Sequence, residues 1–521
     1  MSRKKLAQKI GSMSTAVFLS RILGLVRDII TTAFFGTSYV ADAFQVAFQI
    51  PNLLRKLFGE GALSAAFIPL YSEIGVKRSR KEQIKFGINV LSILTTFLML
   101  LSIIGIVFSP IIVKFLAPGF DQQTYNLTLH LIRIIFPYLF FIGLSSTLIS
   151  ILNAHDYFFI PGLSSAFLNI AMIGALGIFV LLKPDSSIEE QATIWSIGVV
   201  LGGFLQTVVN FPLLKKVGYG FKINMNLKGD DIAAVWRKFL PGVAGLAIRQ
   251  VNLAFDLILA SLLATGSIAA LNYGNRLMQF PLGIFGVATG VAVLPLFSRL
   301  IAEKKWEELV DNLNFSMLSL AFIMLPIIAI IAALGKDMIY LLFMRGAFNE
   351  NSLQMTYIAF LCYASGLLFY SWNRLLIPIF YANKDTKTPV KISAIVISLN
   401  IILDYVLMQF IGHAGLALAT SISALVHYFI LISILKKKLP VINIKNQAKN
   451  LTKITFLSLI IWLSIIYLSR FIPQQSHLFA ALRLVVFGIL GIIIMVFGAQ
   501  VLDIENSKVL GKLIWKKLSK K

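Results

Sequence analysis

The stretch LSRILGLVRDIITTAFFG, residues 19 to 36, is long and apolar enough to form a helix that enters a lipid bilayer. It nevertheless carries Arg21, Arg27 and Asp28 near its middle. An arginine at the centre of a bilayer costs about 2.5–3.5 kcal/mol on insertion scales. The stretch therefore predicts a membrane helix whose charged side chains face protein, water or each other.

Apolar runs of this length recur along the whole chain, which has 521 residues, 58% of them hydrophobic and 13% charged. Soluble globular proteins average about 25% charged residues. The runs are far longer than the ~10-residue strands of a membrane β-barrel, so we expect an all-α polytopic membrane protein. Fourteen transmembrane helices are predicted, at about 14–36, 42–75, 86–115, 125–152, 159–182, 191–214, 235–264, 267–298, 312–343, 353–381, 390–410, 414–435, 452–470 and 478–502.

Lysine and arginine are distributed unequally between the two sides that this span pattern defines. The termini and loops of one side hold 32 of them, whereas the other side holds only Lys183, Arg345 and Arg470. The positive-inside rule then places both termini in the cytoplasm. The net charge of +24 is therefore read as a topology signal, with membrane phospholipid headgroups as expected contacts. Nucleic acid is not an expected partner.

The second half of the chain repeats features of the first half. Arg21 and Asp28 are seven residues apart, as are Arg249 and Asp256, and GTSYVAD at 36–42 matches GSIAALN at 266–272. Both copies start from the same side, which predicts a parallel repeat of two six-helix lobes. We expect an N-lobe at 1–225, a C-lobe at 226–445, and two additional helices within 446–521.

Basic residues outnumber acidic residues in the predicted helices at the start of the two repeat copies. The cations are Arg21, Arg27, Arg55, Arg249 and Arg276; the anions are Asp28, Asp42 and Asp256. Internal ion pairing is the alternative, between Lys56 and Glu60 and between Asp28 and either Arg21 or Arg27. The arginine surplus instead predicts a water-filled cationic cavity that binds a phosphorylated anion, because a guanidinium matches phosphate oxygens as a planar fork.

A second candidate site lies in the C-lobe span ISAIVISLNIILDYVLMQF. Asn400 and Asp404 are one i,i+4 step apart and share a helix face. With Asp256 and Thr420 they offer hard oxygen donors that suit Na⁺ as a coupling ion. The alternative is that Asp256 pairs with Arg249 while the polar residues form ordinary interhelical hydrogen bonds. No other cofactor is expected, and no phosphate-binding G-x-x-x-x-G-K-[ST] motif occurs.

The segments SRILGLVRD and ADAF..AF.IPNLLRKLFGEGALSAAFIPLYSE resemble the N-terminal signature of the MurJ/MviN lipid II flippases. YGNRLMQFPLGIFGVA at 273–288 and RGAF at 345–348 resemble further stretches of that family. The resemblance implies export of lipid II, the undecaprenyl-pyrophosphate-linked peptidoglycan precursor, from the cytoplasmic to the outer leaflet of the bacterial inner membrane. It also implies the cell-wall synthesis and division machinery as partners, and a groove for the lipid tail on 452–502.

The resemblance implies substrate-binding roles for individual residues. The required cavity arginines of the family match Arg21, Arg27 and Arg276, with Arg55 beside them, and a sensitive aspartate matches Asp42. Asp28 joins this candidate set because it follows Arg27 directly and lies about 20° from Arg21 on a helical wheel. Gln279 stands where family members can carry an acid, so no charge role transfers to it.

Three other functions remain as alternatives. A flippase for an O-antigen or capsule unit needs the same pyrophosphate site, and only the family signature separates the two. A multidrug–cation antiporter needs a carboxylate-rich cavity instead. A membrane-embedded glycosyltransferase or phosphotransferase needs acid–base residues at one site, whereas the five histidines are scattered through the chain (His130, His155, His413, His427 and His477).

Overall fold

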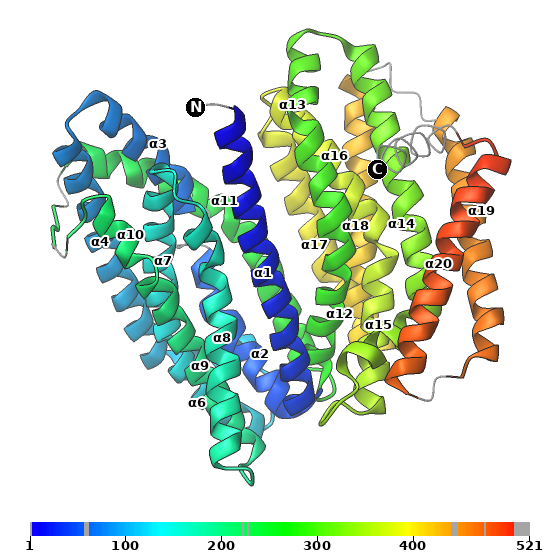
Figure 1. The fold of residues 1–521 in the computed structure, drawn as a ribbon, viewed down its shortest axis with the longest axis horizontal. Helices are drawn as coiled ribbons and strands as arrows, with labels where there is room; N and C mark the ends of the chain where they lie inside the picture. Colours follow the sequence, from blue (N-terminus) through cyan, green and yellow to red (C-terminus); the bar gives the residue numbers. More distant parts are fainter. Residues whose placement is uncertain are drawn as a thin grey trace. The chain divides into compact units, whose positions relative to one another are not determined.

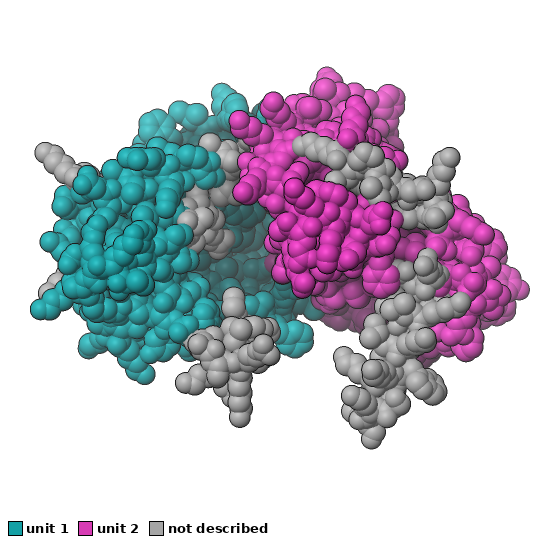
Figure 2. All heavy atoms as spheres, turned by 90° about the horizontal axis from the view of Figure 1, so that it is seen from above, with its two compact units in different colours: residues 1–269 teal, residues 270–521 magenta. Residues whose placement is uncertain are grey.

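A computed structural model describes residues 3–56, 62–220, 223–226, 229–438, 445–473 and 476–504. No residue in these ranges forms a β-strand, and nearly all of them lie in helices (Figure 1). The chain divides into two compact units, Met1–Ala269 and Ala270–Lys521 (Figure 2). The all-helical architecture expected from the apolar runs is confirmed for the described residues.

Unit 1 contains eleven described helices. They are α1 (Arg3–Phe35), α2 (Tyr39–Arg55), α3 (Ala62–Lys77), α4 (Arg80–Val107), α5 (Ser109–Leu116), α6 (Gln122–Ile135), α7 (Pro137–Ala154), α8 (Phe159–Leu182), α9 (Ile188–Val208), α10 (Phe211–Lys216) and α11 (Asp230–Ser261). α12 (Ser267–Pro281) begins in unit 1 and continues into unit 2.

Unit 2 continues from α12 through a π-helical segment and eight further helices. They are η2 (Leu282–Val287), α13 (Ala288–Ala302), α14 (Trp306–Phe343), α15 (Glu350–Ser365), α16 (Leu367–Ala382), α17 (Lys387–Ile411), α18 (His413–Lys438), α19 (Lys445–Leu468) and α20 (His477–Val501), with a 3-10 turn, η3 (Ser469–Phe471), after α19.

Ten stretches of the described chain are long and apolar enough to cross a membrane, and the bent pair α15 and α16 raises this number to eleven. They coincide with eleven of the fourteen predicted spans. The other three predicted spans coincide with α1, with α2 and α3, and with α11. These helices carry most of the charged residues expected inside the bilayer, which lowers their hydropathy. The protein is a multi-pass membrane protein.

Glycines on α9 allow it to pack closely against α8. A Cβ atom added at Gly198 would lie 2.8 Å from the Cα of Met172, and one at Gly202 would lie 2.7 Å from the Cα of Leu168. Two glycines four residues apart let membrane helices approach backbone to backbone. This contact packs α8 tightly against α9 within unit 1.

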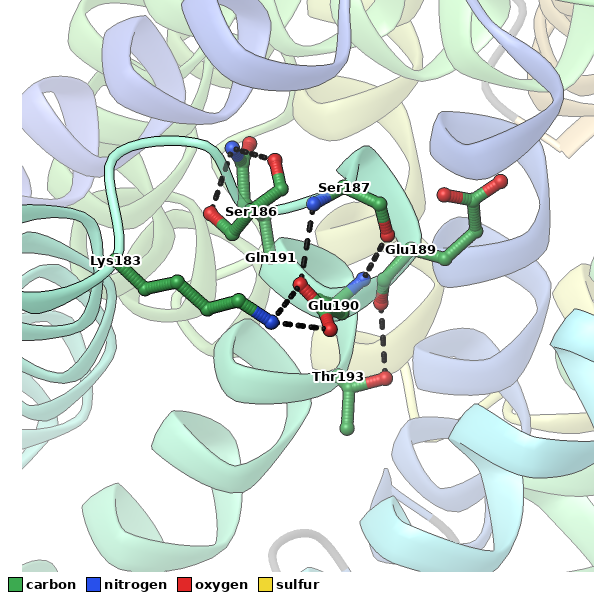
Figure 3. Close-up of polar contacts among 7 residues, drawn as sticks. All are labelled: Lys183, Ser186, Ser187, Glu189, Glu190, Gln191 and Thr193. Carbon is green, nitrogen blue, oxygen red and sulfur yellow. Dashed lines mark hydrogen bonds and ion pairs between the residues drawn. The ribbon is translucent and has the colours of Figure 1, made fainter.

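The turn that joins α8 to α9 is closed by a capping box. The Ser187 hydroxyl accepts from the Glu190 backbone N–H, and the Glu190 carboxylate accepts from the Ser187 N–H. Figure 3 shows Lys183 reaching the same carboxylate, at 2.7 Å and 2.9 Å. These bonds satisfy N–H groups that the first turn of α9 would otherwise leave open.

His155, which follows α7, forms hydrogen bonds that connect the end of α7 to the start of α4. Its Nδ1–H donates to the Ile151 carbonyl at 2.8 Å, and its Nε2 accepts from the Arg80 guanidinium. Arg80 also donates to the Val217 carbonyl at 2.7 Å. Burial and the neighbouring Arg80 lower the pKa of His155, although the Ile151 carbonyl and Asp156 oppose the shift.

Protonation of His155 is therefore expected to lower the free energy of unfolding of the protein. A histidine whose folded-state pKa is depressed contributes its full stability above the unfolded value of 6.5 and loses it as the pH falls below that value. Thermal unfolding of the purified protein between pH 8 and pH 5 measures this loss. His155→Gln keeps an acceptor for Arg80 and should flatten the dependence below pH 6.5; an unchanged slope in that variant would contradict the assignment.

Candidate functional site

α1 presents Arg21 on an exposed face. Arg21 and its neighbour Ile22 are both exposed. Within the described residues, no hydrogen bond or ion pair of the Arg21 side chain is found. Arg21 is thus exposed on this face of α1, and its binding of a phosphorylated anion remains a prediction.

Arg27 lies two turns further along α1 and pairs with its neighbour. Its Nη2 atom is 2.9 Å from Asp28 Oδ1 and its Nε atom 3.2 Å, and both side chains are only 11% exposed. Asp28 thus has Arg27 as an ion-pair partner, one of the two arginines considered from the sequence. The remaining N–H groups of the Arg27 fork can bind a second anion.

Arg55 is at the end of α2 and donates from Nε to Asn52 Oδ1 at 2.8 Å. Lys56 follows it as the C-cap residue. The expected Lys56–Glu60 pair involves Glu60, which lies outside the described residues. Arg276 is on α12 in unit 2, so its convergence with Arg21, Arg27 and Arg55 remains a prediction.

The Asp42 carboxylate binds the first residues of α12. Its Oδ2 accepts from the Gly266 N–H at 2.5 Å and its Oδ1 from the Ala269 N–H at 2.8 Å. Asp42 is only 3% exposed. An anion at a helix N-terminus is stabilised by the unpaired N–H groups and by the helix dipole. The structure therefore gives Asp42 a role in holding a helix end, while a direct contact with substrate remains a prediction.

Two related turns meet beside Asp42. Gly36 and Gly266 both have positive φ, at 52° and 90°, and each comes shortly before a helix. A Cβ added at Gly266 would lie 2.3 Å from the Thr37 carbonyl oxygen, so only glycine fits there. Sequence reasoning missed this contact, although the matched GTSYVAD and GSIAALN segments mark both turns.

The candidate cation ligands come from three helices. Asp256 is on α11 in unit 1 and accepts from Asn252 Nδ2 at 3.3 Å. Asn400 and Asp404 are buried on α17, at 3% and 0% exposure, and Thr420 on α18 donates to the Leu416 carbonyl. α17 and α18 pack closely at Gly415, where an added Cβ would lie 2.5 Å from the backbone of Leu407. The side chain of Arg249, the alternative partner of Asp256, is outside the described set.

The described residues contain no cluster of three histidine, cysteine or acidic side chains that could hold a metal ion. Asn400 and Thr420 add an amide and a hydroxyl oxygen to the carboxylates of Asp256 and Asp404.

α19 and α20 form an apolar groove of about 420 Å³ at the ends joined by residues 469–476. It is lined by Leu468, Phe471, Ile472, Val486, Phe487, Ile489, Leu490 and Ile493. Of the three basic residues within 452–502, Arg483 lies with its Nε atom 3.2 Å from Asp337 Oδ1 on α14, Lys453 donates to the Leu502 carbonyl, and Arg470 lies in η3. The residues that line the groove are all apolar and suit a hydrocarbon chain.

Comparisons with known proteins place the chain among membrane transporters. The family described as "Lipid II flippase MurJ" matches residues 31–487. A probable lipid II flippase MurJ of Buchnera aphidicola (subsp. Schizaphis graminum) is 34% identical over 89% of this chain and 90% of its own length. The lipid II flippase MurJ of Burkholderia cenocepacia is 32% identical over 82% of this chain and 83% of its own length.

Solved structures give the same result. A lipid II flippase MurJ in an inward closed conformation aligns with a TM-score of 0.77 and 29% identity, covering 94% of this chain and 98% of that one. A multidrug resistance transporter of the MATE family aligns with a TM-score of 0.65 at 13% identity, over 81% of this chain and 95% of that one, which shows a shared fold only. The helices and intramembrane charges thus define a multi-pass membrane transporter fold. Within that class, the chain belongs to the lipid II flippase MurJ family.

Proposed function

We propose that this protein translocates lipid II, the undecaprenyl-pyrophosphate-linked peptidoglycan precursor, from the cytoplasmic to the outer leaflet of the bacterial inner membrane. The observation that carries this proposal is the match of the lipid II flippase family to residues 31–487. The assignment makes the protein a transporter and not an enzyme.

In this proposal the arginines Arg21, Arg27, Arg55 and Arg276 bind the pyrophosphate, with Asp28 and Asp42 beside them. Arg21 is exposed on α1 and Arg27 keeps part of its fork open, which supports the assignment. The apolar groove between α19 and α20 would hold part of the undecaprenyl chain through van der Waals packing, since the tail comes from lipid and not from water. The pyrophosphate and the undecaprenyl tail of lipid II would thereby be bound by separate parts of the chain.

We also propose the finer architecture expected from the sequence. It comprises fourteen transmembrane helices in two six-helix lobes, 1–225 and 226–445, related by a parallel repeat, and a C-terminal pair within 446–521, with both termini cytoplasmic. The excess of basic residues on one side and the positive φ of both Gly36 and Gly266 support this topology. Alternating access of the lobes would then expose the arginines to each leaflet in turn. Cell-wall synthesis and division proteins are proposed partners.

Na⁺ is the proposed coupling ion, held by Asp256, Asn400, Asp404 and Thr420. A ligand present at 100 times its Kd stabilises a protein by about 2.7 kcal/mol. Asp404→Asn and Asp256→Asn are therefore expected to remove a Na⁺-dependent increase in thermal stability without removing lipid II binding. Asp311→Asn, at an exposed position on α14, is the control and should keep the Na⁺ response.

The measurement is thermal unfolding and lipid II flux in NaCl, KCl and choline chloride. If the unaltered protein behaves identically in all three salts, the cation site does not exist. The membrane potential acting on the arginines then becomes the better driving force.

The alternative function is a flippase for an O-antigen or capsule precursor on the same lipid carrier. Binding of purified protein to lipid II and to an undecaprenyl-pyrophosphate O-antigen unit, measured by native mass spectrometry in direct competition, separates the two. When the two lipids are present at equal concentrations, we expect the protein to retain lipid II in preference to the O-antigen unit. Preferential retention of the O-antigen unit would contradict the proposed substrate.

A further inference from the structure

α1 is attached to α8 by a polar contact immediately before Arg21. The Ser20 and Ser165 hydroxyl oxygens are 2.6 Å apart. Asn169 Nδ2 donates to the Ser20 carbonyl at 3.4 Å and to the Ser165 carbonyl at 3.5 Å. Ser20 and Asn169 are 9% and 5% exposed. Buried directional bonds therefore hold the backbone of α1 one residue away from a proposed pyrophosphate ligand.

α8 is the main packing partner of α1 in unit 1, and Phe35 at the end of α1 also contacts Trp195 on α9. Among the described helices of that unit, only α8 packs extensively along α1 (Figure 1). Phe18, Ile22 and Leu25 on the opposite face of α1 are 64%, 45% and 41% exposed. Hydrogen bonds between membrane helices act together with their packing and favour one register. The Ser20 contact therefore helps to set the height and rotation of Arg21.

Asn169 is a poor choice for stability alone. Its two hydrogen bonds are long, and its buried Oδ1 atom has no hydrogen-bond partner in the described part of the chain. A buried acceptor without a partner destabilises the folded state, and an apolar residue of similar volume is often equally stable or more so. What Asn169 supplies besides stability is a directional contact with the backbone of α1.

We propose that Asn169 and Ser165 are positioning residues for lipid II, which hold α1 so that the Arg21 guanidinium faces the pyrophosphate. This inference rests on the proposed function. Arg21 makes the contact with the substrate, and the two α8 residues act through Ser20. A tenfold increase in Kd corresponds to about 1.4 kcal/mol, which is the order of one lost hydrogen bond to a charged group.

The test measures the Kd for fluorescent lipid II of the full-length protein in nanodiscs. Asn169→Leu and Ser165→Ala should each weaken binding by about tenfold, with thermal stability unchanged or increased for Asn169→Leu. Ser165→Thr retains the hydroxyl and should retain binding. In an Arg21→Ala background, Asn169→Leu should weaken binding no further, because the group it positions is absent.

The adjacent Ser164 offers a matched control on the other side of α8. It accepts from Asn210 Nδ2 at 3.0 Å and is 2% exposed, so Ser164→Ala removes a comparable buried hydrogen bond without touching α1. This variant should bind lipid II as the unaltered protein does. Equal losses in Ser164→Ala and Ser165→Ala would show a general effect of packing and overturn the positioning role.

Two other outcomes separate this inference from the function on which it rests. If the unaltered protein binds lipid II and Asn169→Leu binds it equally well, the positioning role is wrong and the proposed function stands. If the unaltered protein does not bind lipid II, the proposed function is wrong and the inference fails with it.

Discussion

Alanine at Arg21, Arg27 or Arg276 is expected to abolish or severely reduce lipid II translocation while leaving membrane insertion intact. Each substitution removes a charge-assisted fork that matches two phosphate oxygens. Lysine at the same position should restore only part of the flux, because a point charge replaces a bidentate fork. Flux of fluorescent lipid II in proteoliposomes measures both effects. The proposed site would be wrong if all three alanine variants transported at the unaltered rate.

The control for this series is Arg299→Ala. Arg299 lies at the end of α13, is 72% exposed in its side chain, and bonds Glu303 within the same turn at 2.7 Å. Exposed ion pairs of this kind contribute about 0–1 kcal/mol. We therefore expect Arg299→Ala to insert, fold and transport normally, which shows that loss of an arginine alone does not stop flux.

Arg27 requires a second variant, because its loss also affects Asp28. Breaking a buried ion pair by removing one partner typically costs about 3–5 kcal/mol, so Arg27→Ala could lose activity through instability. Arg27→Ala combined with Asp28→Asn removes both charges and should recover stability. If binding of pyrophosphate is the role of Arg27, the double variant is stable and still inactive.

A cross-link between positions 38 and 267 is expected to stop transport reversibly. The turns before α2 and α12 adjoin: a Cβ at Gly266 would touch the Thr37 carbonyl, and Asp42 binds the Gly266 and Ala269 N–H groups. Cys362 is the single cysteine, so Cys362→Ala gives a background for Ser38→Cys with Ser267→Cys. A short thiol cross-linker should join them, arrest lipid II flux, and release it on cleavage.

A cross-link confined to one loop provides the control. Gln191 Nε2 donates to the Ser186 carbonyl and hydroxyl oxygens at 3.2 Å and 3.3 Å within the α8–α9 turn (Figure 3). Ser186→Cys with Gln191→Cys should therefore be cross-linked with no effect on flux. Complete cross-linking of positions 38 and 267 with undiminished flux would contradict alternating access through this region.

The helices could be predicted because burial in lipid imposes a simple rule on the sequence. Backbone groups in a bilayer must bond internally, so long apolar runs become helices wherever they occur. The expected spans 159–182 and 390–410 accordingly coincide with α8 and α17. Arg27–Asp28 pairing was also within reach, because neighbouring charges in one apolar helix have few other partners.

The roles of Asp42 and Asn169 could not be predicted in the same way. Asp42 binds N–H groups more than 220 residues away along the chain, and Asn169 binds a carbonyl 149 residues away. Neither partner is distinguished by its side chain, because both contacts are made to backbone atoms. Only the packing of α2 beside the start of α12, and of α8 beside α1, brings these groups together.

Movement of lipid II between the leaflets of liposomes that contain only this protein measures the proposed translocation directly. The readout is the fraction of fluorescent lipid II that becomes accessible to an impermeant quencher over time. We expect rapid movement with the unaltered protein and, with Arg21→Ala, movement no faster than in protein-free liposomes. The proposed function would be contradicted if lipid II moved no faster with the unaltered protein than in protein-free liposomes while a Na⁺ gradient and a membrane potential were both applied.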